Sequence, residues 1–181
     1  MKIKDFIIEL VETLVTSFVI IYLIYLFVAS VEVVWGSSME PNFYTGERIL
    51  VEKVTKHVQG FNRGEIVVLI PPSEDSKHYL KRVIGVPGDI VKILDCQVFI
   101  SRDGERFIIE EDYLAEGMCT RPGSTVKEGR SMKLGAGEYF VMGDNRNSSV
   151  DSRSFGKISK KTVLGRVIFR FWPIESFGFI Q

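Results

Sequence analysis

The sequence indicates a mostly β domain that follows a single membrane-spanning helix. Residues 13–31 contain no charged side chain, whereas the chain after Trp35 consists of short β-branched and aromatic runs separated by turn residues. No long segment after residue 35 repeats its apolar residues with the 3.6-residue period of an amphipathic helix. A chain of 181 residues has room for one anchor and one domain of about 150 residues.

The uncharged run has the length and composition of a membrane anchor. Nineteen helical residues, at about 1.5 Å each, would span about 28 Å of a hydrocarbon layer roughly 30 Å thick. A cleavable signal peptide is the main alternative, but its apolar region is usually about 7–15 residues long and precedes a small-x-small site. Ala29-Ser30-Val31 matches such a site poorly. We therefore expect a short segment at 1–12, an uncleaved anchor at 13–34 and the β domain at 35–181.

Strands are expected wherever β-branched and aromatic residues cluster between turn residues. These runs cover residues 48–54, 65–70, 79–84, 98–101, 106–109, 138–142 and 165–172. Pro87-Gly88 predicts a turn, because proline presets one φ angle and glycine accepts the positive φ of the next position. Asp103-Gly104 predicts a hairpin turn. Residues 96–133 are more charged and interrupt the strand pattern, so we expect an inserted subdomain there.

Charge and cysteine content exclude some functions and leave others open. The chain has 23 basic and 23 acidic residues, so no basic excess suggests a nucleic-acid partner. Cys96 and Cys119 can form a disulfide in an oxidising compartment or remain two buried thiols. The remaining zinc-ligand candidates, His57 and His78, have no close ligand spacing with them. No metal or cofactor is expected.

Three polar motifs carry the candidate chemistry. Residues 36–41 directly follow the anchor and include Ser38, residues 79–89 include the adjacent Lys81 and Arg82, and residues 143–153 are rich in Ser, Asp, Asn and Arg. Taken singly, each has an ordinary structural explanation. The first fits a polar connector, the second an edge strand protected by its charges, and the third a surface loop. Strict alternation points Lys81 and Arg82 to opposite faces, so one of them is expected on the more buried side. A desolvated lysine can serve as the base for a serine nucleophile.

Together the three motifs resemble type I signal peptidase, the membrane-bound serine protease that removes signal peptides from exported proteins. The resemblance rests on a Ser-Met-x-Pro box at 38–41, a Lys-Arg box with Gly-x-Pro-Gly-Asp at 81–89, and a Gly-Asp-Asn-Arg box with Asp-Ser-Arg at 143–153. It covers nearly the whole chain. It implies a signal-peptidase-like antiparallel β domain with an inserted subdomain.

The resemblance also implies roles for individual residues. Ser38 would be the nucleophile and Lys81 its general base, and the Ser38 backbone N–H would supply one oxyanion donor. The implied supporting residues are Ser149, which would hydrogen-bond and orient the lysine, and two ionic pairs, Asp144 with Arg82 and Asp151 with Arg153.

Substrate recognition is implied in the same way. Family substrates carry small residues before the cut, typically Ala-x-Ala, and an extended peptide would add to a strand edge. The matching pocket positions are Met39, Tyr79 and Leu80, with Phe43 in addition. Packing in the hydrophobic core is an equally good interpretation of each of these four residues.

Two positions depart from the family pattern. Gly36 occupies a position where some members place a serine whose hydroxyl completes the oxyanion hole, so a second side-chain donor is not expected here. Asn42 stands where threonine is common, and we expect this polar exchange to be tolerated.

Partners and location follow from the resemblance. The expected partners are preprotein signal peptides, the lipid bilayer and the secretion translocon, with no nucleic acid. The expected location is the bacterial cytoplasmic (inner) membrane, with a single span, residues 1–12 in the cytoplasm and the catalytic domain on the extracytoplasmic side. Basic residues lie on both sides of the span, so the positive-inside rule does not decide the orientation. Two alternatives stay open: a specialised pilin- or conjugation-type maturation peptidase, and a non-catalytic membrane-tethered peptide-binding module.

Overall fold

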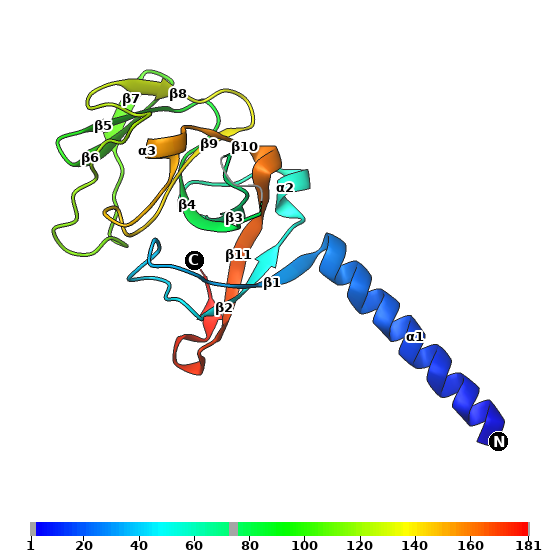
Figure 1. Cartoon of the computed structure of the whole chain (residues 1–181). Helices are drawn as coiled ribbons and strands as arrows, with labels where there is room; N and C mark the ends of the chain where they lie inside the picture. The colour runs from blue at the N-terminus through cyan, green and yellow to red at the C-terminus, as the bar shows by residue number, and fades with distance from the viewer. Residues whose placement is uncertain (1–2, 73–75, 181) are drawn as a thin grey trace.

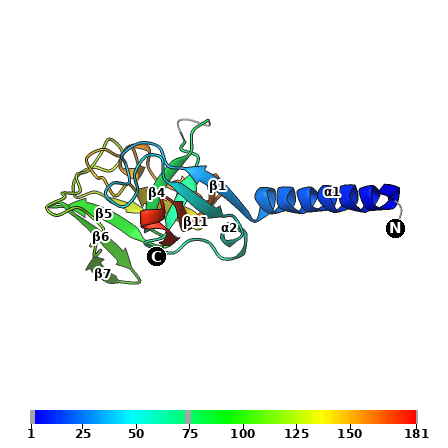
Figure 2. The ribbon, with the colours of Figure 1, turned by 90° about the horizontal axis from the view of Figure 1, so that it is seen from below.

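One long helix projects from a β domain in the structure, a computed structural model that describes residues 3–72 and 76–180 (Figure 1). The helix, α1 (Ile3–Phe27), has no buried residue. Within the described ranges it is the one helix long and apolar enough to cross a membrane. Figure 2, seen from below, shows α1 extending away from the sheets along its whole length.

The helix ends earlier than the sequence predicts. The expected anchor covers 13–34, but α1 ends at Phe27 and strand β1 occupies Ala29–Val33. Strand β1 pairs with β2 (Arg48–Glu52), where Val31 lies opposite Leu50. A run of small and β-branched residues fits either a helix or a strand, and here the neighbouring strand decides.

A lysine fastens the end of α1 to the sheet. Only Val28 separates α1 from β1, and its carbonyl accepts a hydrogen bond of 2.8 Å from the backbone N–H of Lys53. The ammonium of Lys53 donates to the Tyr25 carbonyl at 2.9 Å and lies 5.1 Å from the centre of the Tyr25 ring. A cation in this position satisfies free carbonyls at a helix C-terminus, where the helix dipole also favours it.

The main sheet is antiparallel and contains the elements that position the candidate site. Its order is β1, β2, β11 (Val163–Trp172), β3 (Ile66–Leu69), β4 (Tyr79–Gly85), β9 (Glu138–Met142) and β10 (Ile158–Ser159), and β12 (Gly178–Phe179) pairs with β11. This arrangement confirms the predicted mostly β, antiparallel fold class.

A second antiparallel sheet is inserted between β4 and β9. Its order is β7 (Glu105–Ile108), β6 (Gln97–Arg102), β5 (Ile90–Leu94) and β8 (Ser131–Lys133). The sequence predicts an insertion over 96–133, whereas the second sheet begins at Ile90, directly after the Pro87-Gly88 turn. The predicted hairpin is confirmed, with Asp103 and Gly104 at φ angles of 53° and 88° between β6 and β7. The short helices are α2 (Thr55–Val58), α3 (Ser152–Phe155), η1 (Lys160–Thr162) and η2 (Ile174–Ser176).

Strand β4 lies where three hydrophobic clusters meet. Ile84 belongs to the cluster under the second sheet, Val83 to a cluster with β3 and β9, and Leu80 packs against the cluster around β2. Because both faces of β4 are covered, Lys81 and Arg82 are both buried, at 3% and 7% exposure. Successive side chains of a strand point to opposite faces, so the two cations lie on different faces of β4 and both are buried.

Candidate active site

Ser38 lies in the turn-rich loop that connects β1 to β2. Its carbonyl accepts a hydrogen bond of 3.0 Å from the backbone N–H of Asn145, which ties this loop to the segment after β9. The guanidinium of Arg170 in β11 also holds this loop, since it donates to the Asn42 carbonyl at 2.8 Å and to Glu47 at 2.7 Å. The backbone N–H of Ser38 donates to no atom of the described residues, so it is free to bind a substrate oxygen.

The structure brings Lys81 and Ser38 together. The ammonium nitrogen Nζ of Lys81 donates to Ser38 Oγ at 2.7 Å and to its neighbouring Leu80 carbonyl at 2.9 Å. Burial lowers the pKa of Lys81 from 10.5 to about 8, against the opposing effect of the negative charges of Asp151 and Asp144. A lysine with this pKa is partly neutral near pH 7–8, and a neutral amine can accept the proton of a serine hydroxyl.

The predicted ionic pair of Arg82 and Asp144 is present and buried. Arg82 Nε and Nη2 donate to the two carboxylate oxygens of Asp144 at 2.8 and 2.7 Å. Asp144 also accepts a hydrogen bond of 2.9 Å from the Asn42 side chain. The fork of two bonds fixes the orientation of both groups. The pair thereby joins β4 to the segment that binds the Ser38 carbonyl.

The second predicted pair, Asp151 with Arg153, lies at the start of α3. Arg153 Nε and Nη2 each donate to Asp151 at 2.8 Å, and the Asp151 carboxylate also accepts from the backbone N–H of Gly143 at 3.1 Å. Asp151 is fully buried. Its charge is therefore compensated by one guanidinium and by backbone donors.

The predicted hydrogen bond from Ser149 to Lys81 is not made. Ser149 Oγ is buried and has no partner among the described residues, while Lys81 donates to Leu80 and Ser38 instead. Ser149 nevertheless lies beside the site, because a Cβ atom at Gly143 would be 2.3 Å from both Ser149 Oγ and the Ser38 carbonyl oxygen. Glycine at 143 therefore allows three segments of the site to approach closely.

A groove of about 790 Å³ opens beside the serine and the lysine. One wall is β1 with the residues after it as far as Ser38, and the other wall is the start of β4 with the residues before it. In the described residues, Tyr79, Leu80 and Lys81 pair with β3 on one side, whereas β9 pairs only from Arg82 onward. Within the described residues, no second strand therefore pairs with β4 at Leu80, where the strand lines the groove.

Only two of the four predicted substrate contacts line this groove. Tyr79 and Leu80 do so. Met39 and Phe43, in contrast, are 1% and 2% exposed and belong to the hydrophobic cluster around β2. Their side chains fill the core beneath the Ser38 loop, which agrees with the interpretation of these two residues as core residues.

Three residues that the sequence analysis did not single out complete the surroundings of the site. The ring of Tyr113, from the insertion, stacks over the guanidinium of Arg82 with 4.0 Å between Cζ and the ring centre. Glu111 forms a buried ion pair with Arg146, which in turn donates to the Gly143 carbonyl at 3.0 Å. Arg146 lies inside a recognised motif, but no local pattern marks Tyr113 or Glu111.

The site has the parts that serine hydrolysis with a lysine base requires: a hydroxyl in contact with a desolvated amine, a free backbone donor and a groove for an extended chain. Such a site belongs to the class of serine peptidases. Among residues 3–72 and 76–180, no group of three or more His, Cys, Asp and Glu side chains could hold a metal ion.

Comparison with known proteins places the chain within that class. A family model described as "Signal peptidase, peptidase S26" matches residues 7–172. "Signal peptidase I" of Bacillus licheniformis is 38% identical over 176 residues, covering 95% of this chain and 92% of the relative. "Signal peptidase IB" of Staphylococcus aureus (strain COL) is 32% identical and covers 96% of this chain and 94% of the relative. The chain therefore belongs to the signal peptidase family, peptidase S26, a family of serine endopeptidases.

A cyanobacterial relative and a solved structure carry similar names. "Probable signal peptidase I-2" of Synechocystis sp. is 33% identical and covers 95% of this chain and 76% of the relative. A crystal structure of a signal peptidase I from Enterococcus faecalis V583 matches with a TM-score of 0.47 and 25% identity, covering 60% of this chain and 97% of that chain. The relatives do not favour the alternatives of a specialised maturation peptidase or a non-catalytic module.

The lowered pKa of Lys81 predicts a pH-dependent gain in stability. Below pH 8 the folded protein binds a proton on a buried lysine whose pKa in the unfolded chain is 10.5, so burial weakens the folded state by roughly 3 kcal/mol. This penalty disappears as the pH rises from about 8 to 10.5, because the lysine becomes neutral in both states. We expect Lys81→Met to raise the free energy of unfolding at pH 7 by on the order of 1–3 kcal/mol and to have little effect near pH 10.5.

Denaturant unfolding of both proteins at the two pH values measures this difference. The matched control is Lys133→Met on β8, where the side chain is exposed, and it should change stability equally at both pH values. A Lys81→Met protein that is less stable than the wild type at pH 7 would contradict the assigned burial penalty.

Proposed function

We propose that this chain removes N-terminal signal peptides from exported preproteins, with Ser38 as the nucleophile and Lys81 as its general base. The observation that carries the proposal is the 2.7 Å contact between Ser38 Oγ and the ammonium nitrogen of a buried lysine with a lowered pKa. Membership in the signal peptidase family supports the choice of substrate.

The proposed reaction proceeds through an acyl-enzyme. Neutral Lys81 takes the proton of Ser38 as Oγ attacks the scissile carbonyl, and the oxygen that becomes negative binds the backbone N–H of Ser38. Protonated Lys81 then gives its proton to the amine of the mature protein, which leaves. Lys81 next deprotonates a water molecule, which attacks the ester, and the released Ser38 regains a proton from the lysine. The signal peptide departs with a new carboxylate.

The supporting residues act on the position and charge of the lysine. Leu80 orients its amine in the substrate-free protein through the backbone carbonyl. Ser149 has a buried hydroxyl without a described partner beside Ser38, and this free group supports a role as a further hydrogen-bond partner of Lys81 during the reaction. The pairs of Arg82 with Asp144 and of Arg153 with Asp151 support the proposed positioning from two sides.

The groove beside the start of β4 suggests how the substrate is held. An extended peptide in the groove can lie alongside the start of β4 at Leu80, with alternate side chains directed toward the groove walls. Small residues at the first and third positions before the cut, as in Ala-x-Ala, fit this arrangement, because the side chains that point inward meet a packed core. Met39 and Phe43 form that core under the Ser38 loop.

The membrane topology proposed here has a single span, α1, in the bacterial cytoplasmic membrane and the β domain on the extracytoplasmic side. The exposed apolar surface of α1 supports its contact with the bilayer. The disulfide between Cys96 and Cys119 supports an oxidising compartment for the β domain. The substrates of this enzyme arrive at that side through the secretion translocon, the proposed neighbour in the membrane. No nucleic acid is a partner in this proposal.

Removal of either reacting group should abolish cleavage. We expect Ser38→Ala and Lys81→Met each to lower kcat/KM by at least about 10⁴-fold on an Ala-x-Ala preprotein, measured with detergent-extracted full-length protein. Ser131→Ala and Lys133→Met, both exposed on β8, are the matched controls and should retain activity. Cleavage by Ser38→Ala or Lys81→Met at more than a few per cent of the wild-type rate would exclude the Ser-Lys mechanism.

The activity should rise with pH in the range where Lys81 loses its proton. Since the neutral amine is the active form and its pKa is about 8, kcat/KM should increase about tenfold per pH unit below pH 7 and level off above pH 8 to 9. Rates on a substrate without titratable groups near the cut, at constant ionic strength, provide the measurement. A flat profile between pH 6 and pH 8 would argue against Lys81 as the base.

Replacement of Ser149 separates its role in catalysis from its role in folding. Because the Ser149 hydroxyl is buried without a described partner, Ser149→Ala should leave the free energy of unfolding unchanged or slightly higher. We expect kcat to fall by on the order of 10²-fold, since the hydroxyl binds Lys81 during the reaction. Chemical denaturation and steady-state cleavage of one preparation test both statements, and an unchanged kcat would remove Ser149 from the mechanism.

A further inference from the structure

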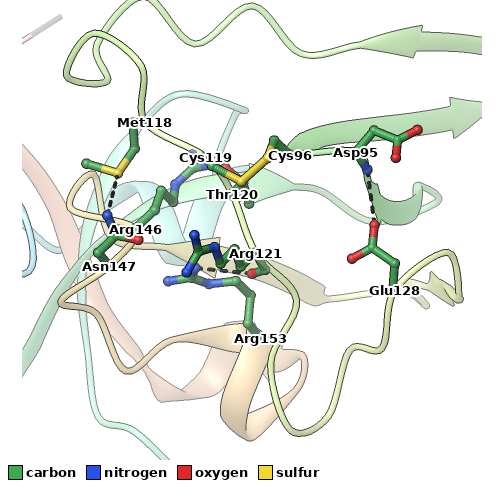
Figure 3. Close-up of a disulfide and its surroundings, with 10 residues drawn as sticks. All are labelled: Asp95, Cys96, Met118, Cys119, Thr120, Arg121, Glu128, Arg146, Asn147 and Arg153. Atoms are coloured by element: carbon green, nitrogen blue, oxygen red, sulfur yellow. Dashed lines mark hydrogen bonds between the residues drawn. A yellow bond between two sulfur atoms is a disulfide. The ribbon is translucent and has the colours of Figure 1, made fainter.

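The insertion contacts the polar segment of the active site along most of its length. Segment 111–121, here called the clamp, runs beside residues 143–153, which contain Asp144, Ser149 and Asp151. Three hydrogen bonds join the two segments, and their acceptors follow one another along the clamp. Met118 Sδ accepts from Asn147, Thr120 Oγ1 accepts from Arg146, and the Arg121 carbonyl accepts from Arg153. Figure 3 shows the first and the last of these as dashed lines on either side of Cys119.

A disulfide fixes the middle of the clamp to the second sheet. Cys119 is bonded to Cys96, and the backbone N–H of Thr120 donates to the Cys96 carbonyl at 3.1 Å. Cys96 occupies the two-residue turn between β5 and β6, where Leu94 pairs with Gln97. A hairpin turn within a paired sheet is a rigid support, so the disulfide holds the clamp at a defined position.

The other end of the clamp reaches the ionic pair next to the catalytic lysine. Tyr113 stacks over Arg82, and its carbonyl accepts a hydrogen bond of 2.8 Å from the side chain of Asn42, which also donates to Asp144. The Tyr113 hydroxyl donates to Glu111 at 2.7 Å. Burial, together with the charge of Glu111, raises the pKa of Tyr113, so this hydroxyl remains a donor throughout the working pH range.

Glu111 completes a second connection to the nucleophile. Its carboxylate binds the guanidinium of Arg146, which is almost fully buried and donates to the Gly143 carbonyl. Desolvation would lower the pKa of Arg146, but the hydrogen bond and charge of Glu111 more than offset it, so Arg146 stays charged. The clamp thus acts on Arg82 beside Lys81 and on Gly143 beside Ser38, although it touches neither reacting group.

We propose that the disulfide-fastened clamp positions the Ser38–Lys81 pair, with Tyr113 and Glu111 as its positioning residues. The proposal rests on the catalytic roles proposed above for Ser38 and Lys81. Without the disulfide, the clamp is held only by non-covalent contacts, and Tyr113 leaves the Arg82 face for part of the time. Since a displacement of about 1 Å between reacting groups can cost on the order of 10²-fold in rate, partial release lowers kcat without abolishing it.

The first experiment varies the stack on Arg82. We expect Tyr113→Ala in full-length, detergent-extracted protein to lower kcat on the order of tenfold, with KM within about twofold of the wild type. Tyr113→Phe keeps the ring and should recover most of the rate. The rate is expressed per site that reacts with a serine-directed acylating inhibitor, so that a smaller folded fraction does not count as slower chemistry.

A matched control uses another aromatic ring on an arginine of the same subdomain. Phe107 in β7 lies over Arg63, with 5.5 Å between Cζ and the ring centre, and Arg63 forms its ion pair with Asp89 rather than with Asp144. Phe107→Ala should leave kcat per reactive site unchanged. If Tyr113→Ala is also unchanged, or if Phe107→Ala loses as much, the positioning role of Tyr113 is wrong.

The second experiment tests whether the disulfide acts through the same contact. Cys96→Ala with Cys119→Ala should lower kcat per site to a similar extent, and adding Tyr113→Ala should cause little further loss, because coupled residues are not additive. If the kcat losses of the cysteine and tyrosine variants multiply in the combined variant, the disulfide does not act through Tyr113.

Reduction of the folded wild type keeps the proposal testable if the cysteine variants fail to fold. A dithiol transfers two electrons and two protons to Cys96 and Cys119 and is itself oxidised to a disulfide. We expect kcat per site to fall on the order of tenfold and to recover after reoxidation. Full activity with both thiols titrated as free would overturn the clamp. Activity in Ser38→Ala, by contrast, would overturn the catalytic roles, so the two failures are distinguishable.

Discussion

The buried pair of Arg82 and Asp144 is the interaction on which the rest of the site depends. Arg82 follows the lysine in β4, while Asp144 precedes the residue whose N–H binds the Ser38 carbonyl. The side chains are 9% and 0% exposed, so each charge is stable there only because of the other. Loss of one partner from such a pair typically costs about 3–5 kcal/mol. One ion pair therefore holds the strand that carries Lys81 against the loop that carries Ser38.

Burial keeps the lysine weakly basic despite two nearby carboxylates. Burial is the main cause of the lowered pKa of Lys81, and the charges of Asp151 and Asp144 oppose it. Each of these carboxylates is bound by an arginine, and the positive charge of Arg153 beside Asp151 lowers the pKa of Lys81 in turn, which offsets part of their effect. The site can thus contain two buried carboxylates and still present an amine that releases its proton near neutral pH.

Much of this arrangement could be predicted from the sequence, because its chemical groups lie in compact motifs. Ser38, Lys81 and the two ionic pairs come from segments whose residue types limit the chemistry, and the β-branched runs marked most strands of the main sheet. Strand β1 was hidden within an apolar run that is equally helical, and only its pairing with β2 decides its conformation. The burial of Met39 and Phe43 depends on how one loop folds back on the core, which no local pattern reports.

The insertion shows the limit of sequence analysis more clearly. Tyr113 meets Arg82, 31 positions earlier in the chain, because a disulfide and a set of side-chain contacts hold the intervening segment in place. The cysteines themselves were compatible with either free thiols or a bond. Contacts of this kind follow from tertiary packing, and the residue types alone do not indicate which aromatic ring of a long excursion returns to which cation.

The single residue between α1 and β1 has a consequence for how the enzyme finds its substrates. Val28 is the whole connection, and Lys53 bonds to the helix end, so the catalytic groove has little freedom to swing on its anchor. In the membrane topology proposed above, enzyme and preprotein would search for each other in two dimensions and meet with their backbones at a nearly fixed height. Confinement raises the effective concentration of chains held in the same membrane and gives no such advantage to peptides in solution. A groove on a long flexible linker would lose this preference for membrane-held chains, since it could reach peptide bonds at many distances from the membrane.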